Sequence, residues 1–409
     1  MNEMKTAKTV SDTKPRSSIT SLYDSYVVPT YKRSLTLVKG QGSYVWDDDG
    51  KQYLDFGGGI ACNCLGHSHP AIKRALQKQS SELIHTSNLY YTELQAQLAQ
   101  SIVKLTGPGK VFFCNSGAES NEALYKLSRK FGAKEGRYEI ITATGSFHGR
   151  TLGGISATGQ EKVKKDFGPL VPGFVHAPFN NLSAFEKAMT DKTAAVLVEG
   201  IQGEGGINLA TPEFILGLRK ITKERNILFL WDGVQCGHFR TGFWQSYEAL
   251  LNETAEAEDF LPDGVAMAKS LGGGFPMGAT WIAQPHADLL QPGTHGTTFG
   301  GTPLACAVAL AVLDEIFKND LPNNIHQRGQ QTRDLLSTLI EGGKIKAVRG
   351  LGGIIGFQPV ETNLDVVARL SAKGLLTVPA GENIIRLLPP LNVTEQEVNQ
   401  ALTIIKETL

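Results

Sequence analysis

Short apolar runs alternate with amphipathic stretches through the middle of the chain. Each apolar run predicts a buried strand, and each amphipathic stretch between two runs predicts a helix. The predicted strands are residues 110–114, 138–143, 194–199, 227–232, 264–268 and 279–283, with helices that include 120–131, 183–189 and 212–224. This alternation predicts an α/β fold, with a mostly parallel sheet flanked by helices on both faces.

The pattern changes towards both ends of the chain. Residues 44–56 place aromatic and branched side chains on either side of an Asp-Gly turn, which predicts a hairpin, and helix periodicity follows at 71–83 and 94–105. A long apolar helix over 303–317 precedes predicted strands at 348–359, 376–378 and 384–388 and helices at 364–372 and 395–408. We therefore expect a disordered tail at 1–20, an N-terminal segment at 21–65 that joins a smaller α+β domain, a large domain at 66–303 and a C-terminal small domain at 304–409.

Composition and charge narrow the class of protein. The 409 residues are 41% hydrophobic and 20% charged, which is ordinary globular composition, and 40 basic residues balance 40 acidic ones. We therefore expect neither nucleic acid nor membrane as a partner. Five cysteines form no paired disulfide framework, and the one-residue spacing of Cys62 and Cys64 does not indicate a metal site. The polar start of the chain lacks the apolar region of a signal peptide, which predicts a cytoplasmic protein.

Two predicted strands end in side chains that suit one chemistry. The run 264–268 ends in Lys269, and glycines follow it. Burial there would favour the neutral amine that a Schiff base needs, although a lone lysine at a strand end more often extends to water. Asp232 ends the run 227–232. A lysine for the aldehyde and an aspartate for the ring nitrogen are the two protein groups expected around pyridoxal phosphate.

Two further segments follow predicted strands. Ser116 and Gly117 precede a predicted helix, whose backbone amides could hold a phosphate, although a plain serine cap gives the same pattern. Neither a P-loop nor a dinucleotide fingerprint is present. Phe147 could stack on a flat cofactor and Arg150 could bind a carboxylate, and the alternative is a capped loop with Phe147 in the core.

Five motifs occur in one order along the chain, at residues 115–119, 146–151, 202–206, 268–269 and 295–301. Together they closely resemble the class III, pyridoxal-phosphate-dependent aminotransferases of fold type I, from about Tyr26 to the C-terminus. The resemblance implies a ping-pong transfer of the terminal amine of N-acetylornithine to 2-oxoglutarate, a step of arginine biosynthesis. It also implies a homodimer with shared active sites, whose small-molecule partners are amino acids and 2-oxo acids.

The resemblance also implies the residues that hold the cofactor. Lys269 would carry it covalently, and Asp232 would pair with the protonated ring nitrogen. Once displaced by the incoming amine, Lys269 is the base nearest the reacting carbon. The remaining implied contacts are Ser116, Gly117 and Ala118 at the phosphate, Phe147 stacked on the ring, Gln235 near the ring hydroxyl, and Thr298 at the phosphate of the neighbouring subunit's cofactor.

The substrate contacts implied by the resemblance separate two carboxylates. Arg150, with help from Tyr31, would hold the carboxylate far from the reacting amine. Arg386 would bind the carboxylate beside the reacting carbon of glutamate, and Glu204 would neutralise Arg386 when the substrate lacks that carboxylate. Ile60 stands where ornithine enzymes carry a tyrosine, which argues against free ornithine.

The chain also departs from the family pattern. Gly233 replaces a glutamate, Phe239 a glycine, Gly200 a proline and Thr302 an asparagine. Two alternatives therefore stay open: another terminal-amine substrate (ornithine, succinylornithine or 4-aminobutyrate), or a homologue that binds the cofactor with impaired turnover.

Overall fold

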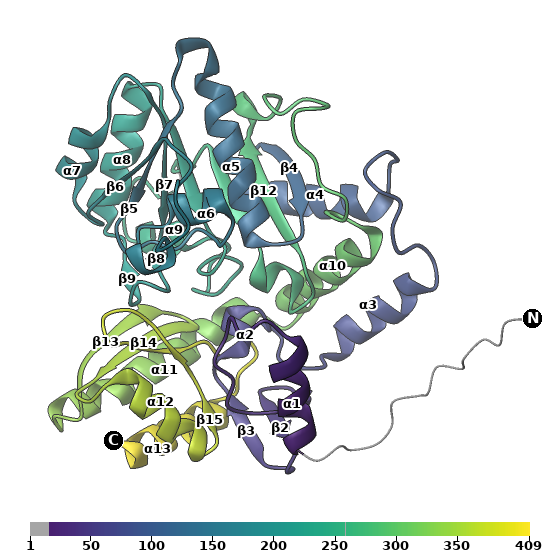
Figure 1. Ribbon diagram of the computed structural model, residues 1–409, viewed down its shortest axis with the longest axis vertical. Helices are drawn as coiled ribbons and strands as arrows, with labels where there is room; N and C mark the ends of the chain where they lie inside the picture. Colours follow the sequence, from purple (N-terminus) through teal and green to yellow (C-terminus); the bar gives the residue numbers. More distant parts are fainter. Residues whose placement is uncertain (1–15, 258) are drawn as a thin grey trace, which may run out of the picture.

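The computed structural model describes residues 16–257 and 259–409, and a seven-stranded sheet forms the centre of its upper part in Figure 1. The strand order is β4-β12-β11-β10-β7-β5-β6, and only β12 runs antiparallel to its neighbours. The strands are β4 (Gly109–Cys114), β5 (Glu139–Ala143), β6 (Phe174–Ala177), β7 (Thr193–Glu199), β10 (Leu228–Asp232), β11 (Gly264–Met267) and β12 (Gly278–Ala283). The predicted mostly parallel sheet is confirmed.

Helices cover both faces of this sheet, because its strands are apolar at consecutive positions. Leu197 of β7 shares a core with Leu124 of one helix, whereas its neighbour Val196 shares another with Phe214 on the opposite face. The helices of this part are α4 (Glu93–Thr106), α5 (Gly117–Gly132), α6 (Leu152–Ala157), α7 (Leu182–Ala188), α8 (Pro212–Glu224), α9 (Ser246–Leu251) and α10 (Pro303–Lys318). Both the α/β fold class and the two-sided cover agree with the sequence prediction.

Two smaller sheets and their helices form the lower part of Figure 1. One sheet joins β1 (Leu37–Gln41), β2 (Tyr44–Asp47) and β3 (Gln52–Asp55) to β15 (Leu375–Leu376), so the two ends of the chain share it. The other has the order β13 (Ile345–Leu351), β14 (Ile354–Pro359), β17 (Ile385–Leu387) and β16 (Val378–Pro379). The helices here are α1 (Arg16–Tyr26), α2 (Gly58–Ala61), α11 (Leu321–Glu341), α12 (Asn363–Ala372) and α13 (Glu395–Thr408), whereas α3 (Pro70–Ser80) packs against α10 of the large part.

Two sequence predictions need correction, and one helix is missing from them. The strand expected at 348–359 is a hairpin of β13 and β14, because Gly352 turns the chain with a φ of 51°. Residues 16–20, expected in the disordered tail, belong to helix α1, and residues 1–15 lie outside the described part. Helix α11 was not predicted at all, since its sequence is largely polar and contains Gly329.

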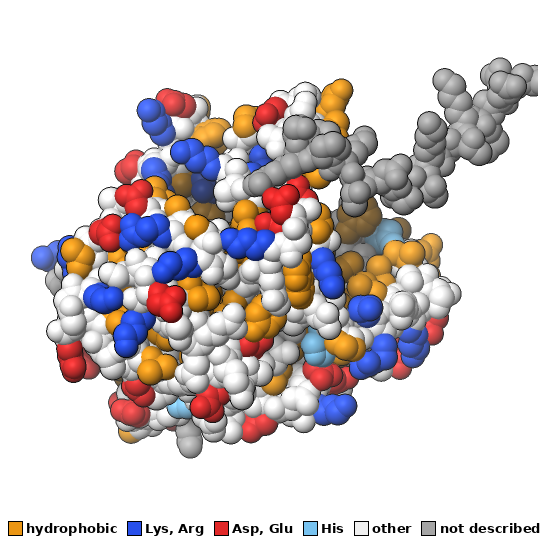
Figure 2. Space-filling model, turned by 90° about the horizontal axis from the view of Figure 1, so that it is seen from below, with side chains coloured by type: hydrophobic (Ala, Val, Ile, Leu, Met, Phe, Trp, Pro, Cys, Tyr) orange, Lys and Arg blue, Asp and Glu red, His pale blue; other side chains and the backbone are white. Residues whose placement is uncertain are grey.

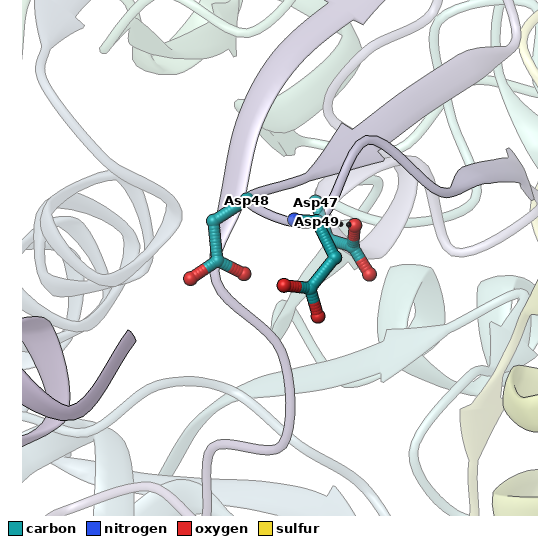
Figure 3. Close-up of side chains that lie close together, drawn as sticks. All are labelled: Asp47, Asp48 and Asp49. Carbon is teal, nitrogen blue, oxygen red and sulfur yellow. Dashed lines mark hydrogen bonds between the residues drawn. The ribbon is translucent and has the colours of Figure 1, made fainter. Parts of the chain in front are cut away.

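The turn between β2 and β3 contains three consecutive aspartates (Figure 3), whose carboxylate oxygens lie within 4.8 Å of one another. The Asp47 carboxylate accepts from the backbone N–H of Asp49 (3.1 Å), the N–H of Lys51 (2.9 Å) and the hydroxyl of Tyr53 (2.7 Å). These hydrogen bonds stabilise the turn between β2 and β3. The hairpin that the sequence predicts at this Asp-Gly turn is therefore confirmed.

One face of the molecule carries charged side chains of both signs. In Figure 2, basic and acidic side chains are interspersed over the face formed by the lower part of Figure 1. None of the helices in the described ranges is long and apolar enough to cross a membrane.

Candidate active site

The strands of the large sheet end at a cavity of about 380 Å³. Asp232 at the end of β10 lies in register with Glu199 at the end of β7, and Lys269 follows β11 on the other side. Parallel strands bring their carboxyl ends to one edge, where α/β proteins bind their ligands. The cavity is lined by Cys62, Asn115, Ser116, Gly117, Ala118, Asn121, Phe147, His148, Gly149, Arg150, Glu199, Asp232, Val234, Gln235, Ala268, Lys269, Gly274, Phe275, Pro276 and Met277.

Lys269 lines this cavity with an unengaged amine. Its backbone has a φ of 46°, a left-handed conformation that costs a non-glycine residue about 1 kcal/mol or more. Across residues 16–257 and 259–409, no hydrogen bond or ion pair involves its amine. Burial lowers the pKa of Lys269, although nearby Glu204 works in the opposite direction. The neutral, nucleophilic form of the amine is therefore favoured.

Asp232 is 3% exposed and is held by three donors. Asn121 Nδ2 lies 2.7 Å and His148 Nδ1 2.8 Å from Oδ2, while the backbone N–H of Val234 donates to Oδ1 at 3.0 Å. The carboxylate is thus fixed in orientation before any ligand enters. Sequence reasoning missed both Asn121 and His148, although Asn121 lies one helical turn after Gly117 on α5 and His148 falls inside a recognised motif.

Glu199 is a second buried carboxyl at the same edge, which sequence analysis placed only in a strand. Burial and the adjacent Asp232 raise its pKa well above the usual range, and the N–H of Phe147 donates to its Oε2 at 3.2 Å. The raised pKa favours the neutral form of Glu199 beside the carboxyl of Asp232. The Phe147 ring lies under the guanidinium of Arg150, 5.3 Å from its centroid.

The N-terminus of α5 forms the opposite end of the cavity. The Ser116 hydroxyl caps the helix by accepting from the N–H of Glu119 (3.2 Å), so the serine is an N-cap as well as a cavity residue. Gly117 and Ala118 follow as its first helical residues. A Cβ at Gly117 would lie 2.6 Å from Val234, so only glycine lets the helix approach this closely. Exposed amides at a helix N-terminus suit a phosphate.

Arg386 and Glu204 form an ion pair beside the cavity. Arg386, on β17, is 1% exposed; its Nη1 donates to Glu204 Oε1 at 2.6 Å and to Gln235 Oε1 at 2.9 Å. Its Nη2 donates to the carbonyl of Pro379 at 3.1 Å. Burial alone would raise the pKa of Glu204, but Arg386 outweighs burial and lowers it, so Glu204 is ionised at neutral pH. Gln235 links the pair to the cavity wall.

Comparison with known proteins matches this arrangement to one family. Residues 26–409 match the family described as aminotransferase class-III. The chain belongs to the class III aminotransferases. It is therefore a pyridoxal-phosphate-dependent transaminase, as the resemblance predicted.

Individual relatives cover nearly the whole chain. The acetylornithine aminotransferase of Caldanaerobacter subterraneus is 46% identical over 390 residues, 94% of this chain and 97% of the relative. That of Gloeobacter violaceus is 44% identical over 396 residues, with 95% and 97% covered. Among solved structures, the ornithine aminotransferase of Toxoplasma gondii ME49 has a TM-score of 0.90 at 31% identity, covering 97% of this chain and 95% of that one. The acetylornithine aminotransferase of Elizabethkingia anophelis has a TM-score of 0.83 at 32% identity, with 97% and 99% covered.

The residues of this transaminase fit its cofactor. A lysine with a free amine, a buried carboxylate and an open helix N-terminus line one cavity, and each suits a different part of pyridoxal phosphate: Lys269 the aldehyde, Asp232 the ring nitrogen, and Ser116 with Gly117 the phosphate. Phe147 adds an aromatic wall beside them.

Five predicted site residues do not line the cavity in this chain alone: Glu204 and Arg386 form the ion pair beside it, and the other three are exposed. Tyr31 is 74% exposed, Ile60 is 39% exposed in a left-handed turn, and Thr298 is exposed on the segment between η4 (Gln284–His286) and α10. The role expected of Thr298 involves a neighbouring subunit, and those of Tyr31 and Ile60 involve substrate. All three remain predictions.

The departures of this transaminase from its family are accommodated by packing. A Cβ at Gly200 would lie 2.4 Å from an indole ring of β10, and one at Gly233 would lie 2.3 Å from Gln245 Oε1. Phe239 is buried despite a φ of 63°, and Thr302 caps α10 by accepting from a backbone N–H. Asp232 and Lys269 still line the same cavity despite these four substitutions.

Proposed function

We propose that this transaminase moves the terminal amine of N-acetylornithine to 2-oxoglutarate, a step of arginine biosynthesis in the cytoplasm. The observation that carries the proposal is the pairing of Arg386 with Glu204 at 2.6 Å beside the cavity. A terminal-amine substrate has no carboxylate next to its reacting carbon, so a buried Arg386 would otherwise face no anion. The names of the relatives support the same substrate.

The pair also explains how one site would serve two unlike amines. Glutamate carries a carboxylate beside its reacting carbon, which would take the place of Glu204 on Arg386. Glu204 is 28% exposed on its side chain, so it has room to turn towards solvent while Arg386 stays fixed by Pro379 and Gln235. The arginine is thus neutralised in both halves of the reaction, by the protein in one and by substrate in the other.

The chain's own residues support the chemistry of proton removal. When bound, pyridoxal phosphate supplies an electron sink for the carbanion left at the substrate carbon. Asp232, fixed by Asn121 and His148, would face the ring nitrogen of the bound cofactor and would favour its protonated form. Lys269, whose lowered pKa favours the free amine, takes the proton from the reacting carbon and returns it.

Arg150 is placed to bind the distal carboxylate that N-acetylornithine and 2-oxoglutarate share. Its guanidinium lies over the Phe147 ring and lines the mouth of the cavity, with its side chain exposed. A planar guanidinium recognises a carboxylate through two parallel bonds. We assign Tyr31 to the same carboxylate and Ile60 to the exclusion of free ornithine.

A second copy of the chain would complete the site. Two neighbouring loops, 83–91 and 295–301, expose Leu89, Tyr90, Tyr91 and Phe299. The loops are joined by Asn88, which donates to the carbonyl of Gly300 at 3.1 Å. Exposed large apolar side chains on two adjoining loops are typical of a protein interface. We therefore propose a homodimer in which Thr298 reaches the cofactor phosphate of the other subunit.

The test is a substrate panel with the purified, cofactor-loaded protein. Glutamate formation from 2-oxoglutarate is measured with N-acetylornithine, ornithine, N-succinylornithine and 4-aminobutyrate. We expect the highest kcat/KM with N-acetylornithine. A higher value with another amine would assign that substrate instead, and no glutamate from any amine would show an impaired homologue.

A further inference from the structure

The loop that carries Glu204 is fastened to the small sheet. It connects β8 (Ile201–Gln202) to β9 (Asn208–Leu209), a hairpin that lies against β13 at the boundary between the upper and lower parts of Figure 1. The backbone N–H of Gly381 donates to the carbonyl of Glu204 at 2.9 Å. A Cβ at Gly381 would lie 2.8 Å from the carbonyl oxygen of Gly205, so the two backbones are in direct contact.

Three side chains join the hairpin to the small sheet. Arg349 of β13 uses Nη1 to contact Glu382 Oε2 at 2.6 Å, Asn208 Oδ1 at 2.6 Å and the carbonyl of Gly206 at 3.1 Å. Asn208 Nδ2 in turn donates to Glu382 Oε1 at 3.1 Å. Each of the three side chains therefore contacts the other two, and their contacts reach the hairpin two and four residues after Glu204.

The turn that supplies Glu382 is rigidly held. Glu382 and Asn383 have φ values of 54° and 60°, so two consecutive non-glycine residues adopt the left-handed conformation. The Asn383 side chain donates to the carbonyl of Glu361 at 2.8 Å and accepts from the N–H of Asn363 at 2.7 Å. This turn leads directly into β17, which carries Arg386. The turn therefore connects to both residues of the ion pair: it contacts the hairpin of Glu204 through Glu382, and it precedes the strand that carries Arg386.

We propose that Arg349, Glu382 and Asn208 are positioning residues that hold Glu204 opposite Arg386. They fix the segment that follows Glu204, while Gly381 holds the carbonyl of Glu204 itself, so that the side chain alone moves between the two half-reactions. Without them the hairpin could leave the small sheet, and Glu204 would neutralise Arg386 less often when a terminal amine is bound. The inference rests on the proposed function and assigns residues that do not touch the reacting atoms.

The experiment compares two half-reactions in single-turnover absorbance measurements on the cofactor-loaded enzyme. One uses N-acetylornithine and the other glutamate, in wild type, Arg349→Met, Glu382→Gln and Asn208→Ala. The matched control is Arg369→Met, which removes an exposed arginine of the same domain whose partner Glu361 lies 2.7 Å away and whose bonds do not involve the hairpin. Arg349→Met is also made in Glu204→Ala.

The inference predicts a change in the ratio of the two rates. The N-acetylornithine rate should fall about fivefold relative to the glutamate rate in Arg349→Met and Glu382→Gln, the size expected for an exposed ion pair of about 1 kcal/mol. The ratio should stay at the wild-type value in Arg369→Met, and Arg349→Met should add nothing in Glu204→Ala. Equal losses in both halves, or a lower melting temperature with an unchanged ratio, would overturn it.

Failure of the proposed function gives a different result. In that case wild type itself shows no half-reaction with N-acetylornithine, and the same ratio is measured with the terminal amine that does react. An unchanged ratio in Arg349→Met with that amine would refute the positioning role.

Discussion

Replacing Glu204 with alanine tests whether Glu204 neutralises Arg386 when a terminal amine is bound. Arg386 would keep only two neutral acceptors, Gln235 at 2.9 Å and the carbonyl of Pro379 at 3.1 Å. Breaking a fully buried pair costs about 3–5 kcal/mol, and partial exposure of Glu204 reduces this to about 2 kcal/mol. The half-reaction with N-acetylornithine should therefore slow about 30-fold.

The glutamate half-reaction should respond in the opposite way. Glutamate brings its own carboxylate to Arg386 and in wild type must first displace Glu204, so the variant should react at the wild-type rate or faster. Cofactor absorbance in a stopped-flow instrument measures each half separately, and Glu204→Gln serves as a control that keeps the size of the side chain without its charge. If both variants slow the two halves equally, Glu204 does not act as a switch.

Three further changes probe the cavity. Lys269→Ala should bind pyridoxal phosphate only noncovalently and lose turnover, so borohydride treatment should add no cofactor mass to the protein; covalent retention would refute the assignment. Arg150→Lys should weaken both half-reactions, because both substrates carry the distal carboxylate, and an effect on one alone would contradict the shared role. Glu199→Gln should raise the melting temperature more at pH 8 than at pH 5. A carboxyl with a raised folded-state pKa destabilises the fold as pH rises above its unfolded value, and the amide does not ionise. Equal shifts at both pH values would show that Glu199 is not held neutral.

The central sheet could be predicted because its strands are apolar on both faces. Six of its strands follow from short apolar runs, but β6 (Phe174–Ala177) was missed because it is short and contains His176. The sequence predicts one strand in place of the hairpin of β13 and β14, because the local apolar pattern continues through the turn at Gly352. Both failures arise where a short or uninterrupted apolar pattern does not mark the start or end of a strand.

In the candidate site, too, some residues can be predicted from the sequence and others only from the fold. Lys269 and Asp232 end apolar runs, so their place at one edge of the sheet could be argued from sequence before their family was considered. Asn121 and His148 reach Asp232 from two other segments, and only folding brings their side chains within 2.8 Å of it. The contact of Arg349 with Glu382 likewise joins positions that no local pattern connects.

We propose that the terminal amine of N-acetylornithine passes through this cavity to 2-oxoglutarate. The most direct measurement uses N-acetylornithine labelled with ¹⁵N at that amine, with the wild-type enzyme, pyridoxal phosphate and 2-oxoglutarate. Mass spectrometry then follows the label. We predict that ¹⁵N appears in glutamate and that Lys269→Ala abolishes the transfer. Unlabelled glutamate, or label that stays in N-acetylornithine while another amine donates its nitrogen, would contradict the account.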